Sequence, residues 1–314
     1  MQPVVAVVTG ASSGIGRATA LEFARRGTSV IAVARRESAL REVASECRRL
    51  GGHALVAAAD VTDEEAVLEV ARAALDRFGQ IDTWVNNAAV TLFARFEETP
   101  PDLYRRVIET NLFGYVHGAR AAIPVFREQG SGVLVTVSSV FGAVGAPYLS
   151  AYVTSKWAIR ALSECLRQEL ADAPDIHVCT VLPASTDTPL FQHAANYTGR
   201  AIVPLRPVYP PERVARAIVR LAQRPRTEVT IGFAGRGALA GRKLAPRLTE
   251  RVTGRVVERS HFEDRAAERT AGNLYEPIPD LALVDGGWRR RRRLVVAGAA
   301  TAVPALVAWL WLRD

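Results

Sequence analysis

The chain contains little cysteine and little histidine, and each shortage excludes a class of structure. Its three cysteines form no CxxC pair and no even-numbered set, which excludes a disulfide-stabilised secreted scaffold. We expect Cys47, Cys165 and Cys179 to be reduced, buried thiols. The five histidines lack the short spacings of metal ligands, so we expect no metal site.

Lysine is also scarce, because the basic residues are nearly all arginine. Among 40 Lys and Arg residues, only Lys156 and Lys243 are lysines. Lysine carries a compact ammonium whose pKa is easily shifted, whereas arginine stays charged and forked. A lysine in such a chain is therefore a candidate for chemistry, with chance as the alternative explanation.

We expect no signal peptide, because the first apolar run lacks a basic leader and enters a glycine-rich turn directly. A length of 314 residues with 49% apolar residues is enough for one large domain with appendages. The net charge of +8 is uneven, since residues 285–314 alone carry +4. The rest has no basic patch with motif support, which argues against a nucleic-acid partner.

The C-terminal end differs from this body. Five consecutive arginines, residues 289–293, precede 19 uncharged residues, 294–312, a length that spans a bilayer as a helix. Trp309 and Trp311 fit an interfacial aromatic belt, and the arginines would stay on the cytoplasmic side. We expect residues 288–314 to anchor a cytoplasmic catalytic domain in a membrane through a transmembrane helix. A buried C-terminal helix is the alternative.

Short apolar runs alternate with amphipathic stretches up to residue 234. The runs show little alternation of apolar and polar residues, as is typical of strands buried on both faces of a parallel sheet. They cover residues 4–8, 30–34, 55–59, 83–85, 133–137, 178–182 and 229–231. The helical stretches cover residues 15–26, 37–50, 63–78, 102–128, 152–171 and 211–223. This order predicts an α/β domain, residues 1–234, with a doubly wound Rossmann-like parallel sheet of about seven strands flanked by helices.

Residues 235–287 form a smaller C-terminal helical extension. Leucine and valine recur there at one-turn spacing with arginines between them, which predicts a basic amphipathic helix. Such a helix fits a membrane surface, or it packs on the domain and helps to enclose the substrate cleft. The prolines and glycines of residues 273–288 indicate an irregular linker to the anchor.

A glycine-rich turn follows the first predicted strand and opens the first predicted helix. It comprises Thr9, Gly10, Ala11, Ser12, Ser13, Gly14, Ile15 and Gly16. Glycine lets the backbone turn tightly and approach a pyrophosphate, and the helix N-terminus directs free N–H groups at the phosphates. The spacing GxxxGxG resembles the short-chain dehydrogenase/reductase family, whose glycine motif is TGxxxGxG.

The second predicted strand ends in two arginines, Arg35 and Arg36, with no carboxylate beside them. A carboxylate there would bind the ribose 2′-hydroxyl of NAD, whereas arginine suits the 2′-phosphate of NADP. The sequence therefore favours NADP over NAD. The alternative is that Arg36 merely begins the next helix on its solvated side.

The resemblance implies further cofactor contacts. Asp60 and Val61 follow the third strand, where the family's aspartate contacts the adenine. Asn87 and Ala88 lie in a segment similar to the family's NNAG, with Ala89 in place of glycine. We expect Asn87 to support the sheet near the cofactor.

A later segment resembles the family's PG…T motif beside the nicotinamide amide. Pro183 and Thr188 match it, and Ala184 replaces the glycine. The loop that follows, residues 190–207, is rich in apolar and aromatic side chains and should form much of the substrate lid. An apolar substrate is expected, although the same side chains could belong to the core.

The predicted catalytic residues are a serine, a tyrosine and a lysine. Ser139 follows the strand over residues 133–137, and Tyr152 and Lys156 are four apart, so they share one helix face. Hydride transfer to or from a carbonyl carbon requires a proton at the oxygen, and free tyrosine has a pKa of about 10. A nearby positive charge, from Lys156 and from an oxidised nicotinamide ring, lowers that pKa, so Tyr152 is predicted to be the general acid and base. Ser139 would hydrogen-bond the substrate oxygen.

YxxxK alone is common in helices, but the Ser–Tyr–Lys combination matches the family residue by residue. The resemblance implies that Lys156 also holds the nicotinamide ribose. It further implies that Asn111 positions a water which connects Lys156 to solvent, with a local helix irregularity beside Gly114 as the alternative. The family also leads us to expect a homo-oligomer.

Three hypotheses follow. The first is a membrane-anchored, NADP-dependent oxidoreductase that interconverts a carbonyl and an alcohol on an apolar or lipid-like substrate. The second is a membrane-tethered nucleotide-binding sensor or scaffold, against which the intact catalytic residues argue, because binding alone needs no proton donor. The third is a soluble enzyme whose last segment packs inside a dimer.

Overall fold

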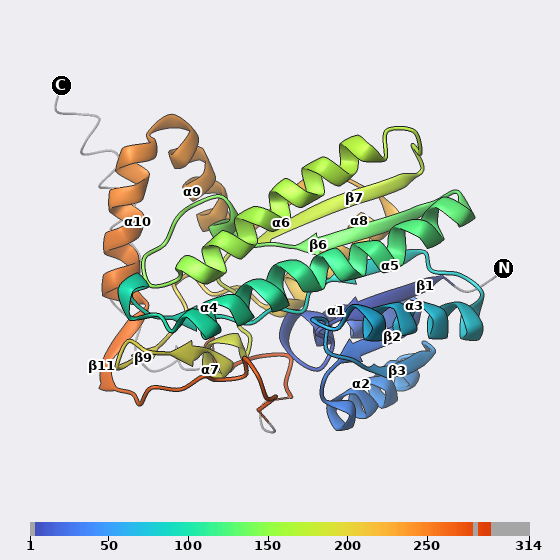
Figure 1. The fold of residues 1–314 in the computed structure, drawn as a ribbon, viewed down its shortest axis with the longest axis horizontal. Coiled ribbons are helices and arrows are strands. Elements are labelled where there is room, and N and C mark those ends of the chain that lie inside the picture. Colours follow the sequence, from blue (N-terminus) through green and yellow to red (C-terminus); the bar gives the residue numbers. More distant parts are fainter. Residues whose placement is uncertain (1–3, 279–281, 290–314) are drawn as a thin grey trace.

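The computed structural model describes residues 4–278 and 282–289, and its centre is one parallel sheet (Figure 1). The seven strands lie in the order β10-β7-β6-β4-β1-β2-β3 and all pair in parallel. In chain order they are β1 (Val5–Thr9), β2 (Ser29–Ala34), β3 (Ala54–Ala58), β4 (Thr83–Asn86), β6 (Gly132–Val137), β7 (Ile176–Pro183) and β10 (Glu228–Ile231). The predicted Rossmann-like sheet is therefore confirmed.

Helices cover both faces of the sheet, which explains why its strands lack a polar side. One face packs against α1 (Gly14–Ala24), α2 (Glu37–Arg49) and α8 (Pro211–Gln223). The other packs against α3 (Glu64–Phe78), α5 (Gly114–Gln129) and α6 (Ser150–Glu169). Along β1, Ala6 and Val8 enter the first core, whereas Val5 and Val7 enter the second. Alternate residues are thus buried on opposite faces, and all must be apolar.

The prediction of one uninterrupted helix over residues 102–128 is wrong. This stretch consists of α4 (Pro101–Ile108), the π-helical turn η2 (Glu109–Phe113) and α5. The interruption holds Asn111, whose side chain binds the backbone of Val90, while Gly114 packs so closely on Val61 that a Cβ would lie 2.7 Å from its Cγ2. A π-turn of this kind often occurs at a functional site.

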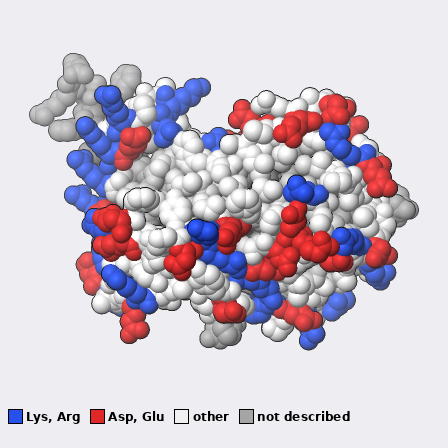
Figure 2. Space-filling model, viewed as in Figure 1, with Lys and Arg blue, Asp and Glu red and all other residues white. Residues whose placement is uncertain are grey.

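The single amphipathic helix expected after residue 234 is two helices, α9 (Phe233–Leu244) and α10 (Pro246–Ser260). The break lies at Ala245, because a proline disfavours helical geometry in the residue before it. Figure 2 shows Lys and Arg side chains gathered where Figure 1 places these helices. Apolar residues are exposed there too, with Leu244 at 84% and Leu248 at 59%.

Two small sheets connect the extension and the lid loop to the body. β9 (Arg200–Ile202) pairs antiparallel with β11 (Phe262–Ala266), which follows α10. β5 (Leu92–Phe93) pairs with β8 (Ala195–Asn196), and β8 follows the short helix α7 (Leu190–His193) in the chain. Residues far apart in sequence thus meet above the carboxyl edge of the main sheet.

The predicted membrane anchor and the three cysteines expected to be buried compare differently with the structure. Within residues 4–278 and 282–289, no helix is both long and apolar enough to cross a membrane. The predicted anchor, residues 294–312, lies outside the described residues and stays a prediction. Cys47 and Cys179 are buried as expected, but Cys165 is exposed, because it lies on the outward side of α6.

Candidate active site

A cavity of about 430 Å³ opens at the carboxyl edge of the sheet, around the switch point between β1 and β4. Ligands of open α/β sheets bind at such a point, because the connections diverge to opposite faces there. The glycine-rich turn follows β1, Asn87 and Ala88 follow β4, Ser139 follows β6, and Pro183 ends β7. Gly10 and residues 12–15 of the turn line the cavity together with the residues after the other three strands, whereas Gly16 does not line it.

The glycine-rich turn has the conformation that a phosphate site requires. Gly10 and Gly14 have φ values of +66° and +56°, which favour glycine. A Cβ on Gly16 would lie 2.1 Å from the carbonyl oxygen of Gly10, so no larger residue fits. Ser13, the N-cap of α1, makes no side-chain cap hydrogen bond, which leaves the helical N–H groups after Gly14 to other acceptors, while the Gly14 N–H binds the Leu283 carbonyl. The turn therefore fits a dinucleotide pyrophosphate.

Asn87 braces this turn from the neighbouring strand. Its side-chain nitrogen donates to the carbonyl of Thr9 at 2.9 Å. The backbone N–H groups of Asn87 and Ala88 donate to the Thr9 hydroxyl at 2.9 and 3.1 Å. These bonds fasten the end of β4 to the end of β1, in agreement with the supporting position expected for Asn87.

Arg35 and Arg36 lie at the end of β2 and line the other end of the cavity. Arg35 donates to the carbonyls of Asn273 and Leu274 at 2.7 and 3.3 Å and to a third at residue 275. Arg36 donates to the carbonyl of Ile278 at 2.6 Å. Burial lowers the pKa of Arg35, yet the group stays a cation at neutral pH. Both guanidinium groups are therefore held at the cavity and not released to solvent.

Asp60 is held in its ionised form beside these arginines. It accepts from the backbone and the hydroxyl of Thr62, and it pairs with Arg106 at 2.7 Å. Burial acts to raise the pKa of Asp60, but the hydrogen bonds from Thr62 and Arg106 outweigh it, so the pKa is lowered. Val61, the next residue, also lines the cavity. No local pattern in the sequence indicated Arg106, which comes from α4.

The described residues of 273–289, which we name the C-terminal strap, lie along the cofactor turn. Besides its bonds to Arg35 and Arg36, the strap accepts from the Gly14 N–H through the Leu283 carbonyl at 2.9 Å. Arg17 donates to the Ala282 carbonyl. The sequence predicted an irregular linker here. The segment is irregular, but these bonds join it to the catalytic domain.

The far end of the strap is fastened to the loop after β7. Asp187 accepts backbone N–H groups from Gly286, Trp288 and Arg289 at 3.1, 2.9 and 3.1 Å. The Trp288 indole donates to the Thr188 carbonyl at 3.2 Å, and Trp288 is buried. Thr188, predicted near the nicotinamide, thus lines the cavity and also holds the strap.

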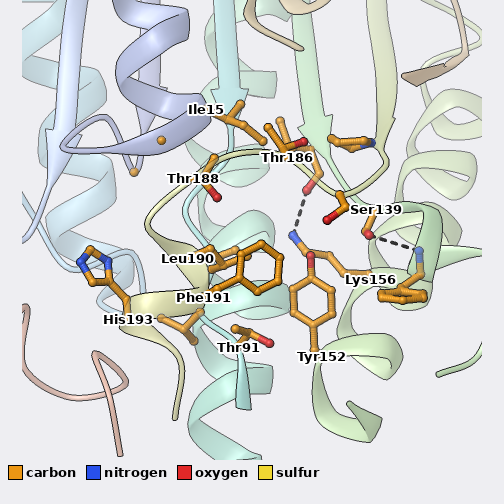
Figure 3. Close-up of a pocket in the computed structure, with 18 of the residues that line it drawn as sticks. Ile15, Thr91, Ser139, Tyr152, Lys156, Thr186, Thr188, Leu190, Phe191 and His193 are labelled. Carbon is orange, nitrogen blue, oxygen red and sulfur yellow. Dashed lines mark hydrogen bonds between the residues drawn. The ribbon is translucent and has the colours of Figure 1, made fainter. Parts of the chain in front are cut away.

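Tyr152 and Lys156 project from α6 toward the cavity, with Ser139 beside them and Leu190 and Phe191 opposite (Figure 3). Ser139 Oγ accepts from the Phe141 N–H at 3.1 Å, which leaves its hydroxyl hydrogen for another acceptor. Burial raises the pKa of Tyr152 to about 12, while hydrogen bonding to Ser139 acts in the opposite direction. We expected a lowered pKa for Tyr152. Among the described residues burial outweighs the stabilisation of the phenolate, and the lowering expected from an oxidised nicotinamide ring stays a prediction.

Lys156 is only 2% exposed and is held at the base of the cavity. Its Nζ donates to the Val137 carbonyl at 2.9 Å and to the Tyr115 hydroxyl at 3.4 Å, and lies 5.6 Å from the centroid of the Tyr152 ring. Burial lowers the pKa of Lys156 to about 7. Tyr115, missed by the sequence analysis, lies four residues after Asn111 and is fully buried here.

Asn111 is fully buried in the π-turn. Its amide exchanges two hydrogen bonds with the backbone of Val90, at 2.8 and 3.0 Å, and donates to the Ser155 hydroxyl at 3.0 Å. Asn111 therefore connects the loop after β4 to the residue that precedes Lys156. The helix irregularity considered for Asn111 is present, and its part in a water relay stays a prediction.

The cavity beyond Tyr152 is largely apolar. The lid loop and α7 contribute Leu190, Phe191 and Leu205 to its lining, the segment after β4 contributes Phe93, and α10 contributes Val252 and Val256. Of the two positions considered for the extension, the structure therefore supports the one that encloses the cleft. The lid expected over residues 190–207 contributes lining residues, whereas Tyr197 packs in a neighbouring core cluster.

The sequence matches the profile of the family described as short chain dehydrogenase over residues 4–197. The chain is a short-chain dehydrogenase/reductase. This enzyme is 36% identical to the uncharacterized oxidoreductase YxnA of Bacillus subtilis, with 97% of the chain and 89% of that protein covered. It is 37% identical to 11-beta-hydroxysteroid dehydrogenase A of Sesamum indicum, over 72% of the chain and 67% of that protein.

Solved structures of the same family share the fold. An alcohol dehydrogenase from Thermococcus sibiricus, complexed with 5-hydroxy-NADP, is 30% identical with a TM-score of 0.64, covering 73% of this chain and 95% of its own. A short-chain dehydrogenase/reductase from Burkholderia phymatum in complex with NAD is 25% identical with a TM-score of 0.72. The match covers 79% of this chain and 95% of that one. The short-chain dehydrogenase/reductase described here is thus an oxidoreductase of the nicotinamide dinucleotide-binding type.

Proposed function

We propose that this chain uses NADP(H) to interconvert a carbonyl and an alcohol on an apolar, lipid-like substrate. The observation that carries the proposal is one continuous cavity with a proton donor at one end and two arginines at the other. Tyr152, with Ser139 and Lys156, forms the first end, and Arg35 and Arg36 form the second. A sensor or scaffold without catalysis would need the arginines but not the proton donor.

The residues at the Tyr152 end of the cavity have separate roles in the reaction. A bound nicotinamide dinucleotide supplies or accepts the hydride. The Tyr152 hydroxyl donates a proton to the carbonyl oxygen in reduction and takes it back in oxidation. With a pKa raised to about 12, Tyr152 holds its proton at neutral pH. The Ser139 hydroxyl donates a hydrogen bond to the same oxygen and stabilises the charge that develops there.

The choice of NADP over NAD rests on the end of β2. Arg35 and Arg36 offer two cations with forked donors and no competing carboxylate on their own strand end, which suits a 2′-phosphate. The remaining dinucleotide would be held by Ser12, Ser13 and Ile15 at the pyrophosphate. Pro183 and Thr188 would hold its nicotinamide end, and Asp60 and Ala88 its adenosine end. In the neighbouring folds both 5-hydroxy-NADP and NAD are bound, so the arginines are the deciding feature of this chain.

The apolar substrate is supported by the cavity lining and by one relative. Phe93, Phe191 and Val256 line the space beyond Tyr152. The relative from Sesamum indicum is named for a hydroxysteroid, a largely apolar alcohol. An anchor over residues 294–312 would keep such an enzyme at a membrane, where lipid-like substrates concentrate. Family membership also supports assembly as a homo-oligomer.

Fluorescence titration of the purified chain with NADPH and NADH tests the proposal. Wild type is expected to bind NADPH more tightly than NADH. Arg35→Ala and Arg36→Ala should each weaken NADPH binding about tenfold or more, because each removes a charge-assisted contact to phosphate. NADH binding should change little. Arg41→Ala is the matched control, since Arg41 lies on α2 and pairs with Glu37 at the surface.

Two results would contradict the proposal at different levels. Equal affinity for NADPH and NADH in wild type, unchanged by both arginine variants, would remove the NADP preference and leave the oxidoreductase intact. A folded chain that binds neither nucleotide would remove the oxidoreductase function itself.

A further inference from the structure

The substrate cavity has a histidine in its wall that the mechanism does not use. His261 follows α10, lines the cavity near Val256 and is only 2% exposed. Its backbone N–H donates to the Val257 carbonyl at 3.0 Å, and its own carbonyl accepts from the Val203 N–H at 2.9 Å. Its ring Nδ1 lies 2.5 Å from the Val203 carbonyl oxygen. Backbone and ring are therefore both fixed in place.

These contacts allow only one neutral tautomer of the ring. A carbonyl oxygen accepts hydrogen bonds and cannot donate, so Nδ1 must carry the hydrogen. Burial lowers the pKa of His261 to about 4, which keeps the ring neutral at neutral pH. Nε2 then carries a lone pair and acts as an acceptor. Across residues 4–278 and 282–289, no protein group donates to it.

The surroundings of this acceptor are aromatic. The ring of Phe93 meets His261 edge-on at 5.0 Å between centroids, and the ring of Phe191 lies at 5.9 Å. Both phenylalanines line the same cavity. An acceptor in an apolar cavity wall loses its water when a substrate fills the cavity, so it discriminates strongly between molecules that supply a donor and molecules that do not.

We propose that Nε2 of His261 accepts a hydrogen bond from a hydroxyl group that the substrate carries at a distance from its reacting carbonyl. The inference rests on the proposed function, because it assigns a second recognition point to the same cavity. The substrate class is thereby narrowed from apolar ketones to apolar ketones with a remote hydroxyl. Tyr152 and Ser139 bind the reacting oxygen, and His261 determines which molecules are placed there.

Straight-chain methyl ketones of increasing length test the proposal. At each length the chain end carries a methyl, a hydroxyl or a methoxy group, so the probes differ in their ability to donate. In wild type, kcat/KM with NADPH is expected to favour the hydroxyl over the methoxy compound about tenfold or more at one best length. His261→Phe should remove this preference, because phenylalanine keeps an aromatic ring in the wall but offers no acceptor.

Two further variants separate recognition from folding. His261→Gln retains an acceptor oxygen and should keep part of the preference for the hydroxyl compound. His117→Phe is the matched control, because His117 also places Nδ1 on a backbone carbonyl, that of Val61 at 2.9 Å, but does not line the cavity. The His117→Phe variant should prefer the hydroxyl over the methoxy compound as strongly as wild type does. A folded His261→Phe variant that keeps the preference would overturn the inference.

The failures of the two proposals are distinguishable. Wild type that reduces ketones but favours no hydroxyl compound at any length overturns the assignment of His261 and leaves the reductase standing. Wild type that reduces none of the ketones with either nucleotide overturns the proposed function, and the inference with it.

Discussion

At the scale of single residues, burial controls the protonation of the catalytic pair. Burial raises the pKa of Tyr152 to about 12 and lowers that of Lys156 to about 7. Both shifts favour the uncharged form, because a low-dielectric interior opposes charge. The phenol therefore keeps the proton that a carbonyl oxygen needs. Lys156 Nζ, fixed on the Val137 carbonyl, can take up or release charge near neutral pH.

Replacing the phenol tests its role directly. Tyr152→Phe is expected to lower kcat by about 10²–10⁴-fold, the usual contribution of a general acid. NADPH affinity should stay within about twofold, because the ring remains in place. Steady-state kinetics and fluorescence titration on the same preparation measure both. Tyr104→Phe, whose hydroxyl contacts Thr154 away from the cavity, should retain full activity. Activity above a tenth of wild type in Tyr152→Phe would contradict the role.

The buried lysine makes stability depend on pH in a defined window. Folding lowers the pKa of Lys156 from 10.5 to about 7, so between these values the unfolded chain binds more protons than the folded chain. Stability should therefore rise with pH across this window, since the folded state no longer holds a buried charge. Lys156→Met removes the group. Its stability relative to wild type should be highest near pH 7 and fall as the pH approaches 10.

Thermal unfolding of wild type and Lys156→Met at several pH values measures this difference. The comparison between the two proteins cancels the titration of other groups, because only residue 156 differs. A stability difference that does not change with pH would mean that Lys156 is charged in the folded chain throughout. Lys243→Met, at an exposed site on α9, is the control and should show no such window.

Short-range chemistry explains which site residues the sequence could predict. Tyr152 and Lys156 are four apart on one helix, and the glycine-rich turn joins adjacent elements, so spacing alone places them. Arg106 and His261 lie far along the chain from their partners Asp60 and Val203, and only the packed fold brings them together. The burial that raises the pKa of Tyr152 was not predictable for the same reason, because burial is a tertiary property.

At the scale of elements, the sheet was predictable and the interruptions were not. Strands buried on both faces must be apolar throughout, so their positions follow from composition. The π-turn depends on Asn111 reaching Val90 in another loop, which no helical periodicity reveals. Pro246, in contrast, is a local signal that predicts the break between α9 and α10. The one-turn repeat of leucine and valine continues across this proline and favoured a single helix instead.

The strap is the element whose contacts suggest a role in holding the cofactor. Its carbonyls bind Arg35, Arg36 and Gly14, and Asp187 fastens its far end through three backbone N–H groups. Asp187→Ala should loosen that end and speed NADPH release about tenfold, because the strap then opens more often. Stopped-flow displacement of NADPH by excess NADP measures the rate.

A matched variant separates this effect from loss of charge. Asp172→Ala removes an aspartate that pairs with Arg127 at the surface and should leave the release rate unchanged. Equal rates in wild type and Asp187→Ala would mean that the strap does not limit departure of the nucleotide.

At the scale of the whole molecule, one corner combines positive charge with exposed apolar surface. On α10, Leu248, Val252 and Val256 are exposed at one-turn spacing, and Arg251 and Arg255 lie beside them. Val252 and Val256 also line the cavity. A basic amphipathic helix of this kind suits an anionic lipid surface. The cavity rim and the predicted anchor over residues 294–312 would then face the same membrane.

Vesicle sedimentation separates the anchor from this surface. The full chain is expected to pellet with neutral and anionic vesicles alike and to require detergent for release, as an inserted helix does. A chain ending at Arg289 keeps the strap and should bind only anionic vesicles, with release by salt, because screening weakens charge attraction. Arg251→Glu with Arg255→Glu in the shorter chain should abolish that binding. If the full chain stays in the supernatant without detergent, residues 294–312 are not an anchor. If the shorter chain does not bind anionic vesicles, α10 acts only as a wall of the substrate cavity.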